Sequence, residues 1–213
     1  MSRFLRERLA LFTLIHALLM KNLLFALAMF SALPAVAKQP SLLDQLSEVL
    51  QAHTDKAPAT AQIEVAFSPD GDAERLVLKV INTARTSVRL AAYSFTSPKV
   101  VRALIAAKRR GVDVRVVVDE EGNKSKSGVA ALNLLVGADV TVRSNGAYAI
   151  HHDKYIIADG LHVQTGSFNY SRAAAESNSE NVIVVWHNPT LAAAYQRHWQ
   201  SRFDEGKKVR SAY

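Results

Sequence analysis

The chain has 213 residues, 49% of them hydrophobic, which is enough for one folded domain with extensions. This apolar share excludes a wholly disordered chain, and the absence of cysteine excludes disulfide bonds and thiolate metal sites. The formal net charge of +7 is a mild bias toward polyanionic partners, although ordinary solubility explains it equally well.

The first 37 residues have the pattern of an export signal. Basic residues precede two apolar runs, and the small residues Ala35 and Ala37 favour cleavage between Ala37 and Lys38. Met20 is a candidate start, because the segment from Met20 to Ala37 has by itself the usual length of ~15 to 30 residues. We therefore expect an exported bacterial protein, periplasmic or secreted, with no stable membrane span after cleavage. The alternative is an uncleaved anchor made of both runs together, since neither run alone reaches the roughly 20 residues of a spanning helix.

Residues 38–60 are predicted to form a short amphipathic arm and a linker. Apolar side chains recur at helical spacing between Ser41, a candidate N-cap, and His53. The sequence leaves open whether this arm packs on the domain or on a partner. After removal of residues 1–37 the chain retains 22 basic and 18 acidic side chains.

Strands and helices alternate from residue 61 onward. Strand patterns occur at 61–67, 87–95, 112–119, 138–144, 150–159, 160–169 and 180–186, and helical patterns at 73–85, 98–110, 128–137 and 189–203. The alternation predicts an α/β fold, a layered α-β-α domain over 61–206 with a mixed, mainly parallel central sheet and a basic tail at 207–213. Short turns between the last three strands predict that these strands are neighbours at the centre of the sheet.

The segment "AIHHDKYIIADG", residues 149–160, places a histidine and a lysine in an apolar strand pattern. Because side chains alternate along a strand, His152 and Lys154 are expected on one face and His151 on the other. An ammonium group has no lone pair and repels cations, so this pair favours an anion site over a metal site.

The segment "TGSFNYS", residues 165–171, adds neutral hydrogen-bond donors. Ser167 and Asn169 follow a tight turn at Gly166, and Glu180 opens the next strand. An imidazole nucleophile, a fixed positive charge, neutral donors and a carboxylate are the groups that attack on a phosphodiester requires.

These residues resemble the signature of the phospholipase D superfamily, which is His-any-Lys, four residues, Asp, and then a Gly-Ser-any-Asn turn. The chain has this register at His152, Lys154, Asp159, Gly166, Ser167 and Asn169, with Glu180 at the position of the family's later acidic residue. The small size, the export signal and the single motif look most like the Nuc-type bacterial endonucleases.

The resemblance implies a role for each residue. His152 would attack phosphorus and form a phosphohistidine, while Lys154 and Asn169 hold the phosphoryl oxygens with help from Ser167. Glu180 would hold His152 in the reactive tautomer. Asp159 is expected to have a structural role near the site and no direct chemistry. No cofactor and no metal is implied.

The two-step reaction needs a second acid-base group, yet the chain carries one motif. We therefore expect a two-fold homodimer in which both copies of His152 share one phosphate.

The motif does not separate two substrate classes. A nonspecific endonuclease acting on DNA or RNA is the first hypothesis, and a phospholipase D that cleaves phospholipid headgroups is the alternative. A phosphate-binding protein without activity is a third hypothesis. Tyr148, Phe168 and Tyr170 flank the motif, where they either stack on bases or pack in the core.

Overall fold

The computed structural model describes residues 62–211, which lie within one compact unit of the chain, His53–Tyr213. The export signal and the whole of the arm and linker lie outside the described residues, so what we expect of them stays a prediction. No helix within residues 62–211 is long and apolar enough to cross a bilayer.

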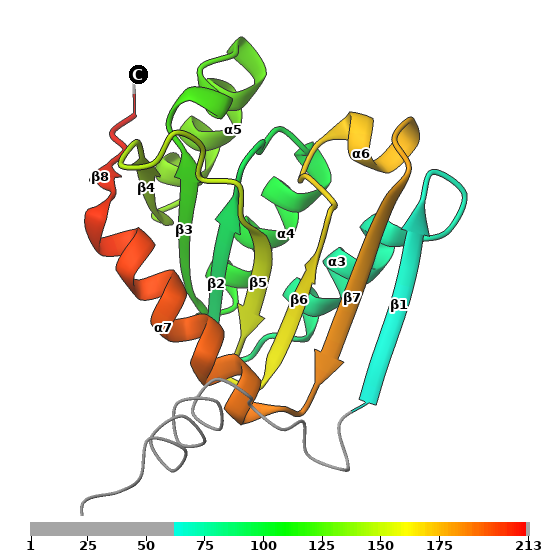
Figure 1. The fold of residues 1–213 in the computed structure, drawn as a ribbon. Coiled ribbons are helices and arrows are strands. Elements are labelled where there is room, and N and C mark those ends of the chain that lie inside the picture. Colours follow the sequence, from blue (N-terminus) through cyan, green and yellow to red (C-terminus); the bar gives the residue numbers. More distant parts are fainter. Residues whose placement is uncertain (1–61, 212–213) are drawn as a thin grey trace, which may run out of the picture. The chain divides into compact units, whose positions relative to one another are not determined.

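An eight-stranded sheet forms the centre of the described part (Figure 1). The order across the sheet is β1-β7-β6-β5-β2-β3-β4-β8. The strands are β1 (Gln62–Ser68), β2 (Ser87–Ala92), β3 (Asp113–Asp119), β4 (Thr141–Asn145), β5 (Lys154–Ala158), β6 (His162–Gly166), β7 (Glu180–Trp186) and β8 (Lys207–Lys208).

The sheet is mixed, as the sequence predicted, but most neighbouring strands are antiparallel. Among the strands of residues 62–211, only β2, β3 and β4 pair in parallel, and a helix lies between consecutive members of this trio. The remaining pairs are antiparallel, so "mainly parallel" is wrong for the strand pairing. The physical reason at β5 and β6 is a connection too short for a crossover, with Asp159 and Gly160 both at positive φ. The prediction that β5, β6 and β7 are adjacent is confirmed, but β7 is not central, because it lies next to the edge strand β1.

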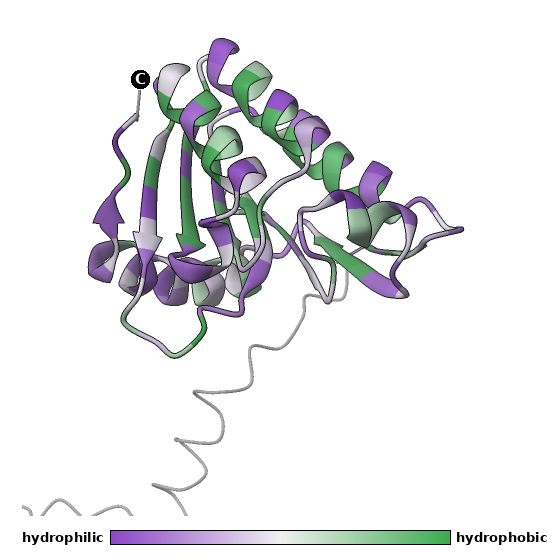
Figure 2. Cartoon of the chain, turned by 90° about the horizontal axis from the view of Figure 1, so that it is seen from above, coloured by the Kyte–Doolittle hydropathy of each residue, from purple (hydrophilic) through white to green (hydrophobic). Residues whose placement is uncertain are grey.

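Helices cover both faces of this sheet. Helices α3 (Ala73–Thr83), α4 (Pro98–Arg109) and α5 (Lys126–Gly137) pack on one face, and α7 (Pro189–Glu205) packs on the other. Figure 2 shows this layering from above, with hydrophobic residues gathered in the strands and helices that face the core and many hydrophilic residues on α7. The predicted α-β-α layering is therefore confirmed.

Alternation along each strand supplies the two layers of the core. On β2, Leu90 belongs to the larger cluster under α3, α4 and α5, whereas its neighbour Ala91 belongs to the smaller cluster with Trp199 of α7. The indole nitrogen of Trp199 donates to the carbonyl oxygen of Leu90 at 3.0 Å, which fixes α7 across the sheet.

Local sequence signals set the helix ends as expected. The Ser97 hydroxyl accepts from the backbone N–H of Val100 at the start of α4, where Pro98 is the first helical residue. Gly111, with φ of 90°, follows the end of α4. Asn188 caps α7 in the same way by accepting from Leu191 N–H at 3.0 Å.

Three short elements escaped the sequence patterns. A 3-10 turn, η1 (Glu121–Asn123), follows β3, and α6 (Arg172–Glu176) lies between β6 and β7. Strand β8 pairs with Arg143 and Ser144 of β4, so the sheet continues into the expected basic tail. Two-residue strands and one-turn helices are too short to leave a periodic pattern.

The strand directions bring the motif to one edge of the sheet. We call this the upper edge, after its place in Figure 1: β2, β3 and β6 end there, and β5 and β7 begin there. Lys154 is the first residue of β5, Gly166 the last of β6 and Glu180 the first of β7. Three segments separated in sequence therefore meet at the upper edge.

Asp159 lies at the opposite, lower edge, so the expectation that it lies near the site is wrong. It follows the last residue of β5, whereas Lys154 opens that strand. Its carboxylate accepts from the backbone N–H groups of Arg85, Thr86 and Ser87 at 2.7 to 3.1 Å, and from the Thr86 hydroxyl. Asp159 thus anchors the start of β2. Partial burial opposes its ionisation, but the hydrogen bonds outweigh burial and lower the pKa of Asp159.

Replacement of this anchor should destabilise the fold. We expect Asp159→Asn to lower the free energy of unfolding by about 1 to 3 kcal/mol at pH 7, because the amide cannot accept from all of these donors. The native pKa is the lower one, so the carboxylate stabilises above its unfolded pKa and loses this effect as the pH falls through the native value. Urea unfolding of both proteins should therefore show a gap that narrows in acid.

The matched control is Asp139→Asn, at another turn residue with positive φ, 59° against 57° at Asp159. Its exposed side chain predicts a change within about 0.5 kcal/mol. Equal losses in both variants would contradict the anchoring role.

Candidate active site

The predicted nucleophile lies just before a strand rather than within one. Strand β5 begins at Lys154, so His152 belongs to the preceding loop and its side chain is exposed, while that of Lys154 is 7% exposed. The loop is held from below by Asp119, at the end of β3, whose carboxylate accepts from the backbone N–H of His151 at 2.8 Å. The predicted strand over 150–159 was too long because this side-chain contact, and not sheet pairing, fixes the loop.

The predicted site residues nevertheless come together. A cavity of about 350 Å³ at the upper edge is lined by the histidine, the lysine, the glycine turn and the acidic residue: His152, Lys154, Gly166, Ser167, Asn169 and Glu180. A second recess of about 430 Å³ shares three of these residues and continues toward α7. Cavities of this size suit small ligands or one part of a larger one.

Lys154 places a positive charge at the bottom of this site. Its ammonium donates to the carbonyl oxygen of His152 at 3.0 Å and lies 5.2 Å from the ring centroid of Tyr93. Burial lowers the pKa of Lys154, whereas the charges of Glu180 and Asp153 favour its ionised form. A partly desolvated ammonium attracts a phosphate group more strongly than one in bulk water.

In the described residues, the hydrogen bonds of the Glu180 carboxylate go to Ser167 and Asn178 and not to the His152 ring. The carboxylate accepts from the Ser167 hydroxyl at 2.5 Å and from the side-chain amide of Asn178 at 3.0 Å. Within residues 62–211 no hydrogen bond joins Glu180 to the His152 ring, so the expected contact is not formed there. Glu180 instead fixes Ser167, whose oxygen also accepts from the backbone N–H of Asn181 at 3.1 Å.

Gly166 has the one conformation in the site that only glycine tolerates well. Its φ is 147°, and a Cβ atom there would lie 2.2 Å from the carbonyl oxygen of Asn181 on β7. The close approach of β6 to β7 at this point depends on the absent side chain. Gly166 therefore sets the position of the Ser167 and Asn169 donors that follow it.

The flanking aromatic residues divide between core and rim. Phe168 and Tyr170 are fully buried, and the Tyr170 hydroxyl donates to Gln164 at 2.8 Å, so both pack in the interior. Asn169, between them, accepts from Ser94 N–H at 3.4 Å, which leaves its NH₂ group as the donor available to an anion. Tyr148 is 39% exposed, and the Arg202 guanidinium lies 4.7 Å from its ring centroid, so stacking of this ring on bases stays a prediction.

Sequence reasoning missed a carboxylate that ties the loop of His152 to α7. Asp153, between the motif histidine and lysine, lies 3.1 Å from Nε2 of His151 and 3.0 Å from Nε2 of His198. Burial opposes its ionisation, but the two imidazoles lower the pKa of Asp153 to about 2. The only sequence signal was the cluster of polar residues around His152, because His198 is remote in the chain.

Two further residues of the site were also missed. Tyr93 lies just beyond β2, and its ring contacts the His152 ring edge-on at 4.9 Å between centroids. Asp119 ends β3 and is 4% exposed. Both lie at the carboxyl ends of buried parallel strands, where sheet proteins commonly place functional side chains, and this position was the available signal.

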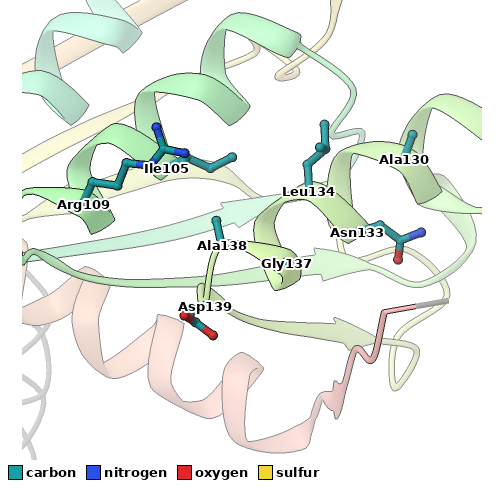
Figure 3. A pocket seen from close by; sticks show the side chains of 8 residues that line it. All are labelled: Ile105, Arg109, Ala130, Asn133, Leu134, Gly137, Ala138 and Asp139. Atoms are coloured by element: carbon teal, nitrogen blue, oxygen red, sulfur yellow. The ribbon is translucent and has the colours of Figure 1, made fainter. Parts of the chain in front are cut away.

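A larger cavity lies away from this chemistry. It has a volume of about 690 Å³ and is formed between α4 and α5, with Ile105, Arg109, Leu134 and Asp139 among its lining residues (Figure 3). No motif residue lines it, so the upper edge is the candidate active site. Within residues 62–211, no three histidine or acidic side chains are grouped to hold a metal ion.

A comparison with known protein families shows which family has this motif and fold. Residues 77–203, more than half of the chain, match the family model described as the cardiolipin synthase, PLD-like domain. The chain belongs to the phospholipase D-like family. The resemblance seen in the motif is thereby confirmed.

The relatives of this chain include a protein named Nuc and proteins named for the hydrolysis of phospholipids. The crystal structure of Nuc, a phospholipase D family member from Salmonella typhimurium, is 46% identical with a TM-score of 0.70 and covers 71% of this chain and 99% of its own. A phospholipase D of Rickettsia bellii is 35% identical over 67% of this chain and 69% of its own length. A mitochondrial cardiolipin hydrolase of Xenopus laevis is 31% identical over 64% of this chain and 63% of its own length.

Family membership settles the reaction class. The chain is a phosphodiester hydrolase of the phospholipase D superfamily. The hypothesis of a phosphate-binding protein without activity is therefore set aside. The choice between nucleic acid and phospholipid is a separate question.

Replacement of Gly166 should disrupt the site. We expect Gly166→Ala to destabilise the fold by more than about 3 kcal/mol, or to displace β6 from β7, because the methyl group would overlap the Asn181 carbonyl. Urea unfolding and hydrolysis of a synthetic phosphodiester would measure both effects.

Gly137→Ala is the matched control, since a Cβ atom there meets nothing within 4 Å. Helix propensity predicts a stability equal to or up to about 1 kcal/mol above wild type. A Gly166→Ala protein with the stability and activity of the Gly137→Ala protein would show that the close approach is unimportant.

Proposed function

We propose that this protein is an endonuclease with little sequence preference, which hydrolyses phosphodiester bonds of nucleic acid through a phosphohistidine. The observation that carries the proposal is the cavity that brings His152 beside Lys154, Ser167 and Asn169. His152 supplies a nucleophile, and Lys154 and Asn169 supply donors for the phosphoryl oxygens, while Glu180 holds the Ser167 hydroxyl beside them.

The chemistry has two steps. A ring nitrogen of His152 attacks phosphorus, the bond to the leaving oxygen breaks, and that oxygen takes a proton from a second imidazolium. Water then attacks the phosphohistidine, the P–N bond breaks, and the second imidazole takes the proton of the water. Lys154 and Asn169 stabilise the negative charge on the nonbridging oxygens in both steps.

Nucleic acid is favoured by charge and by similarity. The chain retains a basic excess without its first 37 residues, and a phosphate backbone is recognised mainly by positive charge. The Salmonella protein named Nuc is 46% identical over nearly its whole length. The motif register also resembles the Nuc-type endonucleases.

One observation favours phospholipid as the second candidate. Tyr148 and Ile150, on the loop before His152, are 39% and 53% exposed at the rim of the site. Exposed apolar side chains beside an active site suit contact with a lipid surface. The relatives named phospholipase D and cardiolipin hydrolase support the same alternative.

A nuclease assay in chelator tests the leading proposal. We expect plasmid DNA to be cleaved in EDTA, with a rate that falls as salt is added, and His152→Ala to lower the rate by about 100-fold or more. Vesicles of phosphatidylcholine and of cardiolipin, assayed in parallel, identify the alternative substrate.

His162→Ala is the matched control, because His162 opens β6 at the lower edge, remote from the cavity. Its effect should be confined to stability. Cleavage abolished by EDTA, or equal rates for wild type and His152→Ala, would overturn the proposed mechanism.

We further propose that the active enzyme is a two-fold homodimer with a shared site. Each chain supplies one His152, and the reaction needs a second acid-base group. The edge strand β1 also presents Ile63, Val65 and Phe67, exposed by 58%, 54% and 58%, on its outer face. Phe67 pairs with Asn181, next to Glu180, so this outer β1 face runs up to the site. A second copy of the chain would cover apolar surface that is costly to leave in water.

Mixed dimers test the shared site. Wild-type and His152→Ala subunits, unfolded together and refolded in varied proportions, should give an activity that follows the square of the wild-type fraction. Linear dependence would mean that each subunit works alone, and sedimentation of an active monomer would refute the dimer.

Substitution of two exposed valines tests whether the outer β1 face forms the dimer interface. Val65→Asp should shift sedimentation toward the monomer and lower activity. Val129→Asp, at a valine of α5 that is 40% exposed, should change neither.

A further inference from the structure

The reactive imidazole has one defined aromatic neighbour. In the described residues the ring of His152 makes no side-chain hydrogen bond, but the Tyr93 ring meets it edge-on, with centroids 4.9 Å apart and planes at 61°. An exposed imidazole without such a neighbour would rotate about its side-chain bonds and spend much of its time turned away from phosphorus. Edge-to-face packing restricts those rotations.

The same Tyr93 ring also meets the ammonium of Lys154, which lies 5.2 Å from its centroid. A cation beside an aromatic face is attracted by the negative charge of the π system. Tyr93 therefore contacts both the nucleophile and the cation of the proposed reaction. The register explains why: Ala92 pairs with Lys154 across β2 and β5, so the next residue of the chain faces the segment with His152.

The Tyr93 backbone is held by a buried amide. Asn123, 3% exposed, donates from its side chain to the Tyr93 carbonyl at 2.7 Å and to the Asp119 carbonyl at 2.8 Å, and it accepts from Phe95 N–H at 2.8 Å. These bonds tie the loop after β2 to the loop after β3. Tyr93 is therefore a fixed wall of the site.

The Tyr93 ring also packs closely against the backbone at Gly122. A methyl group at Gly122 would come within 3.0 Å of Cε2 of Tyr93 and within 3.1 Å of the Asp119 carboxylate. The loop after β3 thus passes close to the ring only because residue 122 has no side chain. The same Asp119 carboxylate accepts from Gly122 N–H at 2.6 Å and from His151 N–H at 2.8 Å, which couples this loop to the one with the nucleophile.

We propose that Tyr93 is a positioning residue, whose ring holds the His152 imidazole and the Lys154 ammonium in the arrangement that receives the phosphate. This inference rests on the proposed function, in which His152 attacks phosphorus. It assigns the work to the ring and not to the hydroxyl group. The loss of the ring should therefore matter, and the loss of the hydroxyl should not.

The electrostatic consequence has a definite sign. Burial lowers the pKa of Lys154, and Glu180 and Asp153 raise it. The His152 ring, in the same cavity, and the Tyr93 phenol are the further titratable groups near this ammonium. A π face favours the ammonium, and leucine would keep an apolar side chain beside Lys154 without that face, so Tyr93→Leu should lower the pKa of Lys154 further. If Lys154 must be protonated, the alkaline limb of the kcat/KM profile moves to lower pH.

The test compares Tyr93→Leu with Tyr93→Phe on bis(p-nitrophenyl) phosphate, a diester that belongs to neither substrate class. We expect Tyr93→Leu to lower kcat by about 10- to 100-fold with a smaller change in KM, because a poorly oriented nucleophile affects the chemical step. Tyr93→Phe should restore the rate to within about threefold of wild type. Only the leucine variant should move the alkaline limb.

A second measurement does not depend on activity. NMR of the Lys154 side chain, labelled at Cε, reports its titration in the folded protein, and thermal unfolding shows whether each variant folds. A Lys154 titration that shifts to lower pH in Tyr93→Leu but not in Tyr93→Phe supports the proposal. This result would stand even if His152→Ala retained activity, because retained activity would contradict only the proposed phosphohistidine mechanism. Equal kinetics and titration in both variants, or a loss of rate without movement of the alkaline limb, would overturn the proposal.

Discussion

The arrangement of side chains at the upper edge of the sheet depends on the ammonium of Lys154, which is buried at the start of β5 at a cost in solvation free energy. Removal of an ammonium from water is unfavourable unless oxygen atoms, negative charges or a π face replace the water. The protein supplies all three, in the His152 carbonyl, the carboxylates of Glu180 and Asp153, and the Tyr93 ring. None of these neutralises the charge by a direct ion pair, so it remains available to an incoming phosphate.

The positions of these groups follow from strand pairing and from buried side-chain bonds. Strand β5 lies between β2 and β6. Lys154 therefore has Ala92 of β2 as its partner on one side, and β6 ends at Gly166 on the other side. Asp119 and Asn123 then fix the loops that rise above the sheet. A carboxylate that accepts two backbone N–H groups holds a loop more firmly than its own turns do, because unpaired buried donors are costly.

The acidic residues of the motif region have different roles in the structure. Asp159, part of the family signature, anchors β2 at the lower edge, whereas Asp153, outside that signature, joins the loop of His152 to α7. Glu180 fixes the Ser167 hydroxyl. A signature in sequence thus marks residues that the fold and the reaction both need, without stating which need each one serves.

The sequence by itself determined the layered α/β class, the helix ends at Pro98 and Pro189, and the residues of the cavity, because periodicity, capping and a spaced motif are local properties of the chain. Only the tertiary structure decided that most strand pairs are antiparallel, that β8 extends the sheet, and that Tyr93, Asp119 and His198 join the site. It also moved Asp159 away from the site and separated Glu180 from His152. The physical reason is that strand order and side-chain contacts between remote segments arise from packing of the whole domain, and no local pattern encodes them.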